Sequence, residues 1–295
     1  MILLRIQGGL GNQLFQYAAA RQLSLRLNTK LYIDPSSYSN DDYGRTYGLN
    51  MYNIEAEMAP EKMINNWRSF TSHYRIQNFT SRLSSRLPKS LRFHNLIEYE
   101  FQPYNVSFSK FSGFIILNGY FQSPHYFDCI ADIIRKDLIL TQEPSKESKC
   151  LSAVMHECNS ISIHVRRADY ITHPGASQLF EVLSKEYYRL AMELLTEQVV
   201  NPRIFVFSDD INWCRKNLTF IVDTTFVDHE GAHTDYEALW LMSQCKHHII
   251  ANSSFSWWGA WLGNNPAKLI VAPKTWFIDK TMIINDLIPS DWNTL

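Results

Sequence analysis

The chain of 295 residues carries 28 lysines and arginines against 29 aspartates and glutamates, a formal net charge of −1 that excludes nucleic-acid binding through a strongly basic surface. Apolar residues make up 45% of the chain, which is enough for the cores of two ordinary domains. The five scattered cysteines contain no C-x-x-C pair, which argues against a disulfide framework or a zinc site and for a reducing compartment.

The first 34 residues predict a βαβ unit around a glycine-rich loop. Strand, helix and strand patterns occupy residues 1–6, 14–27 and 30–34. Three glycines in the loop Gln7–Gln13 let the backbone approach a ligand, and the helix N-terminus that follows favours an anion. The loop imitates the dinucleotide fingerprint, with Gly9-Leu10-Gly11 as G-x-G and Asp34 near the position of the ribose-binding acid. Leu14 replaces the third glycine, so a plain turn stays an alternative.

The middle of the chain has weaker patterns. Residues 35–110 predict no clear element, and residues 114–117 predict a strand. Ser123 is placed to cap a helix with Pro124 at its first position. The polar stretch Thr141–Lys149, which contains a proline, is the predicted domain boundary. It divides the chain into an N-terminal domain at residues 1–150 and a C-terminal domain at residues 151–295.

From Ser160 onward, strands and helices alternate regularly. Strands are predicted at residues 161–166, 204–207, 224–227, 247–251 and 268–272, and helices from residues 184, 234 and 252. The helix from residue 234 begins with the capping box Thr-Asp-Tyr-Glu. Repeated βα units predict a parallel sheet with helices on both faces. The predicted fold class is therefore α/β, with two Rossmann-type, doubly wound domains and a cleft between them.

The strand at residues 161–166 ends in charged side chains. Isoleucine and valine alternate along it with polar residues, which is typical of a strand. Arg166 and Arg167 follow at its carboxyl end, where parallel sheets bind ligands, and their guanidinium forks match phosphate oxygens. Asp169 is placed to orient one of the two arginines. A surface ion pair is the alternative, but His164, on the same face of the strand as Arg166, favours a binding site.

Three further predicted strands end in polar groups that can face the same cleft. These groups lie at residues 8–13, 208–210 and 252–255. Ser253 and Ser254, at a helix N-terminus, offer a second phosphate cradle. Phe255 can stack on a base, and Asp209 can accept two N–H donors from the edge of a guanine. Taken alone, each of these residues is typical of a helix cap or a core. Because all of them are predicted at the carboxyl ends of parallel strands, together they indicate a binding site.

Four motifs in this order resemble those of the bacterial α-1,2-fucosyltransferases of glycosyltransferase family 11. They are Gly-Gly-Leu-Gly-Asn-Gln-Leu-Phe-Gln-Tyr at residues 8–17, His-Val-Arg-Arg-Ala-Asp-Tyr at 164–170, Phe-Ser-Asp-Asp at 207–210 and Asn-Ser-Ser-Phe-Ser-Trp-Trp at 252–258. The resemblance implies a GT-B-like fold, with GDP-β-L-fucose bound by the C-terminal domain and a galactoside acceptor on the side of the N-terminal domain. It implies inverting transfer of L-fucose to the 2-hydroxyl of a terminal galactose, with no metal and no other cofactor.

The same resemblance implies roles for individual residues. Donor binding falls to Gly11, Asn12, His164, Arg166, Arg167, Asp169, Asp209, Ser253, Ser254 and Phe255. Arg166 and Arg167 would also stabilise the charge on the departing GDP. Asp34, at the end of the second predicted strand, is the predicted catalytic base. Acceptor binding falls to Asp34, Gln122 and Tyr170.

The chain departs from the family pattern at three positions. Ala168 stands where the family usually has glycine, which bears on the conformation of the loop around the arginines. Phe121 and Pro124 stand where the family usually has tryptophan and glutamate, which indicates a different acceptor pocket.

Two other functions use some of the same residues. An NAD-dependent oxidoreductase would use Gly9–Gly11 and Asp34 and would leave the other three motifs without a role. A nucleotide-sugar or glycan-binding protein would use the whole site without catalysis. No spacing of His, Cys, Asp or Glu fits a metal site, so we expect no metal.

The segment at residues 62–97 contains seven lysines or arginines and no acid. Leucines at every fourth residue from 83 to 91 lie beside three of these basic residues, which is a basic amphipathic pattern, with a solvated surface as the alternative. No apolar run has membrane-spanning length, and the three apolar residues before Arg5 are too few for the apolar region of a signal peptide, so we expect neither a span nor a signal peptide. We therefore expect a cytoplasmic protein that docks weakly on the anionic inner membrane through residues 62–97 and acts on an acceptor linked to a lipid.

Overall fold

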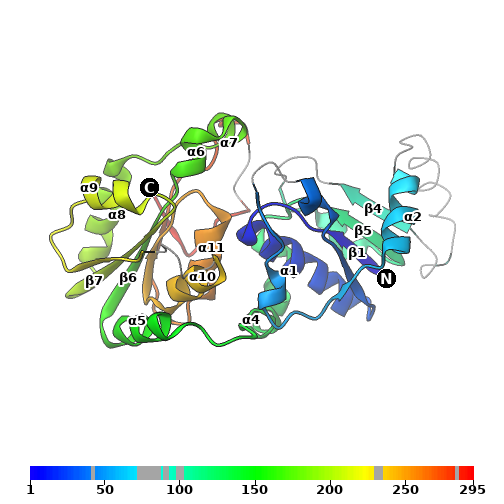
Figure 1. Ribbon diagram of the computed structural model, residues 1–295, viewed down its shortest axis with the longest axis horizontal. Helices are drawn as coiled ribbons and strands as arrows, with labels where there is room; N and C mark the ends of the chain where they lie inside the picture. The colour runs from blue at the N-terminus through cyan, green and yellow to red at the C-terminus, as the bar shows by residue number, and fades with distance from the viewer. Residues whose placement is uncertain (41–43, 72–87, 89–92, 98–102, 229–234, 283–285) are drawn as a thin grey trace. The chain divides into compact units, whose positions relative to one another are not determined.

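The computed structural model describes the chain except for residues 41–43, 72–87, 89–92, 98–102, 229–234 and 283–285 (Figure 1). The chain divides into two compact units, and each unit is built on its own parallel sheet. The first unit comprises Met1–Thr141 with Asn285–Leu287, and the second comprises Gln142–Ile284 with Ile288–Leu295. The predicted α/β fold class is confirmed.

The first unit is built on a sheet in the order β3-β2-β1-β5-β4, and every pairing of its described strands is parallel. These strands are β1 (Ile2–Arg5), β2 (Leu31–Asp34), β3 (Glu57–Met58), β4 (Phe93–Ile97) and β5 (Phe114–Asn118). Helix α1 (Leu10–Arg26) connects β1 to β2 and packs on both, which confirms the predicted βαβ unit. The helix begins earlier than predicted, because the Gly9 carbonyl accepts the amides of Asn12 and Gln13 at 2.9 and 3.1 Å.

Several short elements complete the first unit. They are α2 (Glu61–Thr71), α4 (Ala131–Asp137) and the 3-10 turns η1 (Ser36–Asn40), η2 (Leu49–Met51), η4 (Val106–Lys110), η5 (Pro124–Tyr126) and η6 (Asp128–Ile130). Met63 of α2 packs on Leu3 and Ile116, so apolar side chains cover one face of the sheet. The helix predicted after Ser123 is a single 3-10 turn, and the Ser123 hydroxyl caps it by accepting the His125 amide at 3.3 Å.

The second unit is built on parallel strands in the order β11-β10-β9-β6-β7-β8. The strands are β6 (Asn159–Val165), β7 (Pro202–Ser208), β8 (Thr224–Phe226), β9 (His247–Ile249), β10 (Ile270–Ala272) and β11 (Asn293–Thr294). The helices are α5 (Lys146–Glu157), α6 (Ala168–Thr172), α7 (Pro174–Leu179), α8 (Lys185–Thr196), α9 (Ile211–Asn217), α10 (Asp235–Gln244) and α11 (Ser254–Leu262). Every strand that the sequence predicts in this half is present.

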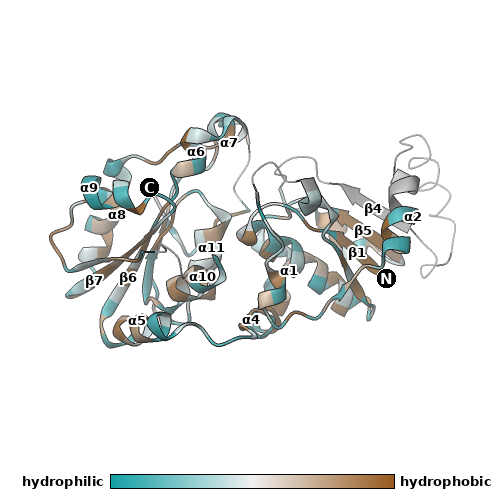
Figure 2. Ribbon diagram, in the orientation of Figure 1, coloured by the Kyte–Doolittle hydropathy of each residue, from teal (hydrophilic) through white to brown (hydrophobic). Residues whose placement is uncertain are grey.

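Helices cover both faces of the second sheet. On one face, Ile161, Ile163 and Val165 of β6 share a core with the inward side chains of α8 and α9. On the other face, the His164 ring lies 5.7 Å from the ring of Phe255 in α11. The alternation predicted for β6 is therefore confirmed. Figure 2 shows largely apolar strands such as β1 and β5 beside helices whose outer sides are polar.

The boundary falls between residues 141 and 142, at the start of the stretch Thr141–Lys149 that was predicted to hold it, and helix α5 belongs wholly to the second unit, so the division is earlier than residue 150. The start of α5 is held by Glu237 of α10, whose Oε1 accepts the Ser145 amide at 2.9 Å. Its Oε2 accepts the hydroxyls of Ser145 and Ser148 at 2.9 and 2.8 Å. A division after residue 150 would cut this helix. Thr234, the other member of the predicted capping box, lies outside the described residues.

His248 is a buried imidazole in the core of the second unit, and it makes the fold sensitive to acid. The residue is 1% exposed, and its Nδ1 lies 2.8 Å from the Ser162 hydroxyl. Burial, with the nearby charges of Lys268 and His247, holds the pKa of His248 well below its ordinary value of 6.5. Below pH 6.5, His248 is protonated in the unfolded chain but stays neutral in the folded chain. The free energy of unfolding therefore falls as the pH drops below 6.5.

We expect His248→Asn, whose amide can still bond Ser162, to flatten this part of the pH profile. Between about pH 8 and about pH 5.5, the free energy of unfolding should fall by on the order of 1 kcal/mol more in the unaltered protein than in the variant. Urea unfolding at a series of pH values measures the difference. His156→Asn, at an exposed histidine of α5, is the control. Identical pH profiles for His248→Asn and the unaltered protein would contradict the prediction.

Candidate functional site

Hydrogen bonds from Tyr38 and Gln13 fix the conformation of the glycine-rich loop after β1. The Gly8 carbonyl accepts the Tyr38 hydroxyl at 2.8 Å and the Gln13 side-chain amide at 3.1 Å. Gly8 has a φ of +78°, and a Cβ there would lie 2.7 Å from Nδ2 of Asn12. A side chain at Gly8 would therefore strain the backbone and displace Asn12, so this position requires glycine. Gly11 lies in the first turn of α1.

Asn12 and Gln122 meet at the carboxyl ends of β1 and β5. Gln122 Nε2 donates to Oδ1 of Asn12 at 2.7 Å, which joins the start of α1 to the loop after β5. Gln122 is 9% exposed, and its Oε1 has no hydrogen-bond partner among the described residues. The preceding residue, Phe121, is fully buried and has a φ of +51°, which is uncommon for an aromatic side chain. The loop is thus held in a strained conformation that presents Gln122 to Asn12.

Asp34 ends β2, as predicted, and its side chain is 1% exposed. Its Oδ1 accepts the Ser36 amide at 3.0 Å, which is the contact of a turn residue. The predicted base is therefore placed at the carboxyl edge of the sheet but engaged in a turn. Tyr170, which is predicted to bind the acceptor, is also engaged within the protein. Its hydroxyl donates to the Asn252 carbonyl at 2.8 Å, and its ring stacks on Phe180 at 4.8 Å.

The loop after β6, which we call the arginine loop (residues 166–169), is held by Asp209 at the end of the neighbouring β7. Asp209 Oδ1 accepts the Arg167 amide at 2.9 Å, and Oδ2 accepts the Ala168 amide at 3.1 Å. Oδ2 also lies 3.3 Å from Nε of Arg166. Both carboxylate oxygens thus hold the loop, while the predicted contact of Asp209 with guanine stays a prediction.

Arg166 is enclosed by two carboxylates. Its Nη2 donates to Asp169 at 2.5 Å, in addition to the contact of Nε with Asp209. Burial lowers the pKa of the guanidinium, but the charges of Asp209 and Asp169 outweigh burial and raise it above its ordinary value. Burial raises the pKa of Asp209, because it disfavours the charged carboxylate, and the charge of Arg166 opposes that shift only in part. Arg166, Asp169 and Asp209 therefore form one charged network, in which Asp169 contacts one of the two arginines, as predicted.

Arg167 is held differently, by residues that were not among the predicted site residues. Its guanidinium carbon lies 4.4 Å from the centre of the Trp213 ring in α9. Its Nε lies 3.6 Å from Oδ2 of Asp210, which also caps α9 by accepting the Trp213 amide at 3.0 Å. The sequence does contain a signal for Trp213. Asp210 is a typical N-cap residue, and a helix that starts there places residue 213 in its first turn, directly after β7.

Ser253 and Ser254 open helix α11 beside this network. Ser253 is 9% exposed and makes no side-chain cap hydrogen bond, although its carbonyl accepts the Trp257 amide at 3.0 Å. The preceding Asn252 fixes the turn through Nδ2, which donates to the carbonyls of Glu181 and Trp276 at 2.9 and 3.0 Å. The helix N-terminus predicted as a phosphate cradle is therefore formed, on the face of the sheet where Phe255 contacts His164.

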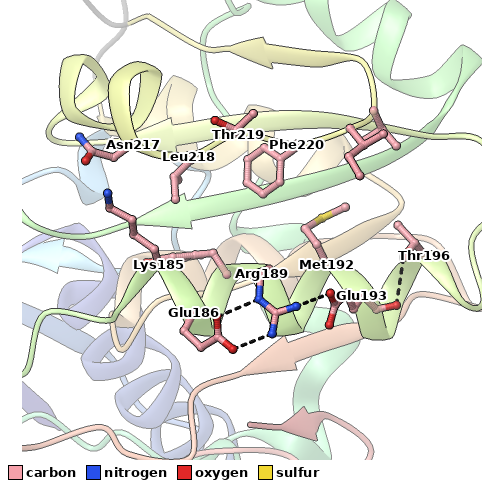
Figure 3. Close-up of a pocket in the computed structure, with 13 residues that line it drawn as sticks. Lys185, Glu186, Arg189, Met192, Glu193, Thr196, Asn217, Leu218, Thr219 and Phe220 are labelled. Carbon is pink, nitrogen blue, oxygen red and sulfur yellow. Dashed lines mark hydrogen bonds and ion pairs between the residues drawn. The ribbon is translucent and has the colours of Figure 1, made fainter.

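A separate groove of about 360 Å³ runs along α8, between that helix and residues 217–222 (Figure 3). Arg189 lines it, and its guanidinium donates to Glu186 at 2.6 and 2.8 Å and also to Glu193. The charge of Arg189 is thus matched within the groove. The arginine loop, with its paired guanidiniums at a strand end, suits an anionic ligand better.

Two units of parallel sheet flanked by helices, with arginines at the carboxyl end of a central strand of the second unit, have the architecture of the GT-B-like fold. A FUT1 mutant from Arabidopsis thaliana, solved in complex with GDP, matches with a TM-score of 0.56 at 13% identity, over 91% of this chain and 69% of that chain. This likeness concerns the fold alone. The chain belongs to glycosyl transferase family 11, whose model matches residues 1–295.

Relatives of known activity agree with the family. An α-1,2-colitosyltransferase from Escherichia coli is 32% identical, over 99% of this chain and 98% of its own length. The O-antigen biosynthesis glycosyltransferase WbnK, also from Escherichia coli, is 32% identical over 92% of this chain and 93% of its own length. The human galactoside α-(1,2)-fucosyltransferase 1 is 24% identical over 86% of this chain and 63% of its own length. The family resemblance predicted from the four motifs is confirmed.

Proposed function

We propose that this glycosyltransferase is a galactoside α-1,2-fucosyltransferase, which transfers L-fucose from GDP-β-L-fucose to the 2-hydroxyl of a terminal galactose with inversion. The arginine loop held by Asp209 carries the proposal, because it offers a diphosphate two guanidiniums at a strand end. The fold shared with a fucosyltransferase solved with GDP supports a guanosine diphosphate donor. The name of the human relative supports the fucosyl group and the linkage. An NAD-dependent oxidoreductase no longer fits a member of family 11.

The proposed reaction is a single displacement. The acceptor hydroxyl attacks the anomeric carbon of fucose as the bond to GDP breaks, so negative charge builds up on the diphosphate. Arg166 and Arg167 stabilise that charge, and Ser253 and Ser254 at the start of α11 offer further donors. His164 and Phe255 complete the donor side within the second unit. The proposal includes no metal, so activity should persist in EDTA.

Transfer of colitose is a second candidate, because the colitosyltransferase is 32% identical over nearly the whole chain. Colitose is fucose without its 3-hydroxyl, so one donor site can hold either sugar. Product analysis separates the possibilities. The protein is incubated with GDP-fucose or GDP-colitose, and with lactose or a Gal-β-1,3 acceptor, and the linkage is read by NMR. An α-1,2-fucosylated product is expected. Transfer of the sugar to water alone, or no turnover with any galactoside, would contradict the proposal, and GDP binding without any turnover would favour a binding protein.

The assignment of Asp34 as the base stays a prediction, and Asp34→Asn tests it. Asparagine keeps an oxygen that can accept the Ser36 amide, so the turn is preserved while the basic carboxylate is lost. A base role predicts loss of transfer with an unchanged GDP affinity in calorimetry. Normal turnover by the variant would assign Asp34 to the turn alone.

The proposed membrane contact of residues 62–97 also remains to be tested. Residues 82, 86 and 89, which carry the predicted basic pattern, lie outside the described residues, and the end of the segment forms β4. In the described part of the chain, no helix is long and apolar enough to cross a membrane. Co-sedimentation should show binding to vesicles with anionic lipid but not to neutral ones, weakening with salt. Absence of binding at low salt would contradict the prediction.

A further inference from the structure

The guanidinium of Arg167 is placed by an aromatic face and not by hydrogen bonds. Its carbon lies 4.4 Å from the centre of the Trp213 ring, which is within the range of a cation–π contact. Its Nε lies 3.6 Å from Oδ2 of Asp210, beyond hydrogen-bond distance, and has no hydrogen-bond partner among the described residues. The side chain is 24% exposed. The guanidinium of Arg167 is therefore oriented, while its N–H groups stay available to donate to a ligand.

Trp213 is itself fixed on the first turn of α9. Its amide donates to Oδ1 of Asp210 at 3.0 Å, and its carbonyl accepts Nδ2 of Asn217 at 2.9 Å. The amide of Asp210 donates in turn to the Ser208 hydroxyl at 2.9 Å, which ties the start of α9 to the end of β7. The indole packs against the apolar core beneath α8 and α9. Trp213 thus offers Arg167 a rigid platform.

The two arginines differ in how much of their charge a ligand can use. Arg166 is neutralised by Asp169 at 2.5 Å and Asp209 at 3.3 Å. An aromatic ring attracts a cation through its quadrupole and adds no formal negative charge. Arg167 has one carboxylate nearby, Asp210 at 3.6 Å, so it keeps more of its positive charge for an incoming diphosphate than Arg166 does. Trp213 also restricts the side-chain conformations of Arg167 before binding, so less conformational entropy is lost when a ligand binds.

We propose that Trp213 is a positioning residue, which holds the Arg167 guanidinium so that its N–H fork meets the diphosphate of the nucleotide-sugar donor. This inference rests on the proposed role of the arginine loop in donor binding. It predicts that the aromatic character of residue 213, and not only its size, sets the affinity for GDP. It also predicts that the effect passes through Arg167 alone.

Calorimetric titration of GDP into five proteins tests the proposal: the unaltered chain, Trp213→Leu, Trp213→Phe, Arg167→Met and the double variant that combines Trp213→Leu with Arg167→Met. Trp213→Leu should weaken GDP binding by about two- to thirtyfold, the range of a cation–π contact, and Trp213→Phe should recover most of the loss. In the Arg167→Met background, Trp213→Leu should have no further effect. In steady-state assays, Trp213→Leu should raise the KM for the donor and leave the KM for the acceptor unchanged.

Equal weakening by Trp213→Leu in both backgrounds would overturn the inference, since Trp213 would then support only the fold. Unchanged GDP affinity in Trp213→Leu would overturn it as well. If Arg167→Met binds GDP as the unaltered chain does, the donor role of Arg167 fails and the inference fails with it. Should Trp213→Leu not fold, a fluorinated tryptophan at position 213 alone keeps the shape while withdrawing π density. GDP affinity should then fall with each added fluorine, and constant affinity would overturn the inference.

Discussion

Replacing Asp209 with asparagine is expected to lower kcat/KM for the donor by between about a hundredfold and a thousandfold. The carboxylate accepts the amides of Arg167 and Ala168 at 2.9 and 3.1 Å and pairs with Arg166 at 3.3 Å. An asparagine keeps one acceptor oxygen, but its NH₂ group would face an amide donor, and no charge would remain beside Nε of Arg166. The arginine loop would lose its anchor, so donor binding and transition-state stabilisation would both suffer.

Steady-state kinetics and GDP calorimetry measure this effect, with Asp223→Asn as the matched control. Asp223 pairs with Arg203 at 3.0 Å in the same unit, but its side chain is 67% exposed, so we expect a change of no more than about twofold. Because burial raises the pKa of Asp209, acid should neutralise its carboxylate at a higher pH than that of an ordinary aspartate. Activity of the unaltered protein should fall on the acid side accordingly. Full activity in Asp209→Asn would show that the loop holds its shape without this carboxylate.

Replacing Arg166 with lysine is expected to lower kcat by about a hundredfold, although the charge is kept. The guanidinium bonds Asp169 through Nη2 at 2.5 Å and reaches Asp209 through Nε at 3.3 Å, which uses two of its nitrogens. The single nitrogen of a lysine cannot satisfy both carboxylates and a phosphate in one plane. Single-turnover measurements at saturating donor and acceptor report the loss on the chemical step.

Arg215→Lys is the control for the lysine variant. Arg215 pairs with Asp228 at 3.0 Å on an exposed surface, so turnover should stay within about twofold of the unaltered protein. Full activity in Arg166→Lys would remove Arg166 from the catalytic role and leave Arg167 as the main source of positive charge. Loss of activity with an unchanged unfolding midpoint would exclude a general loss of folding.

Local patterns were sufficient to predict the elements that carry the site. In β6, Ile161, Ile163 and Val165 face the apolar core under α8 and α9, while His164 lies on the other face beside Phe255, so the alternation of apolar and polar residues can be recognised without knowledge of the neighbours. Ser184 was predicted to open a helix, and its hydroxyl accepts the Tyr187 amide at 3.2 Å at the start of α8. A cap and an alternating strand are both short-range features, which is why one sequence reveals them.

The contacts that organise the site join residues that are distant in the sequence. Asp209 bonds the amides at 167 and 168 only because β6 and β7 are parallel neighbours, with Val165 paired to Ser208. Glu237 similarly caps α5, more than eighty residues earlier. No local pattern encodes such pairings. Strand β3, with two residues, is too short for any periodicity, so this part of the first sheet could not be predicted either.

The hydrogen bond from the amide of residue 168 to Asp209 determines which substitutions this position tolerates. Asp209 holds the backbone amide of Ala168 and makes no use of its side chain, and every amino acid except proline has that amide. Residue 168 begins α6 and is not among the residues with a positive φ, so the freedom of glycine is not required. Alanine in place of the usual glycine therefore leaves the loop intact. A substitution at residue 168 therefore keeps this backbone contact, provided that the new residue is not proline.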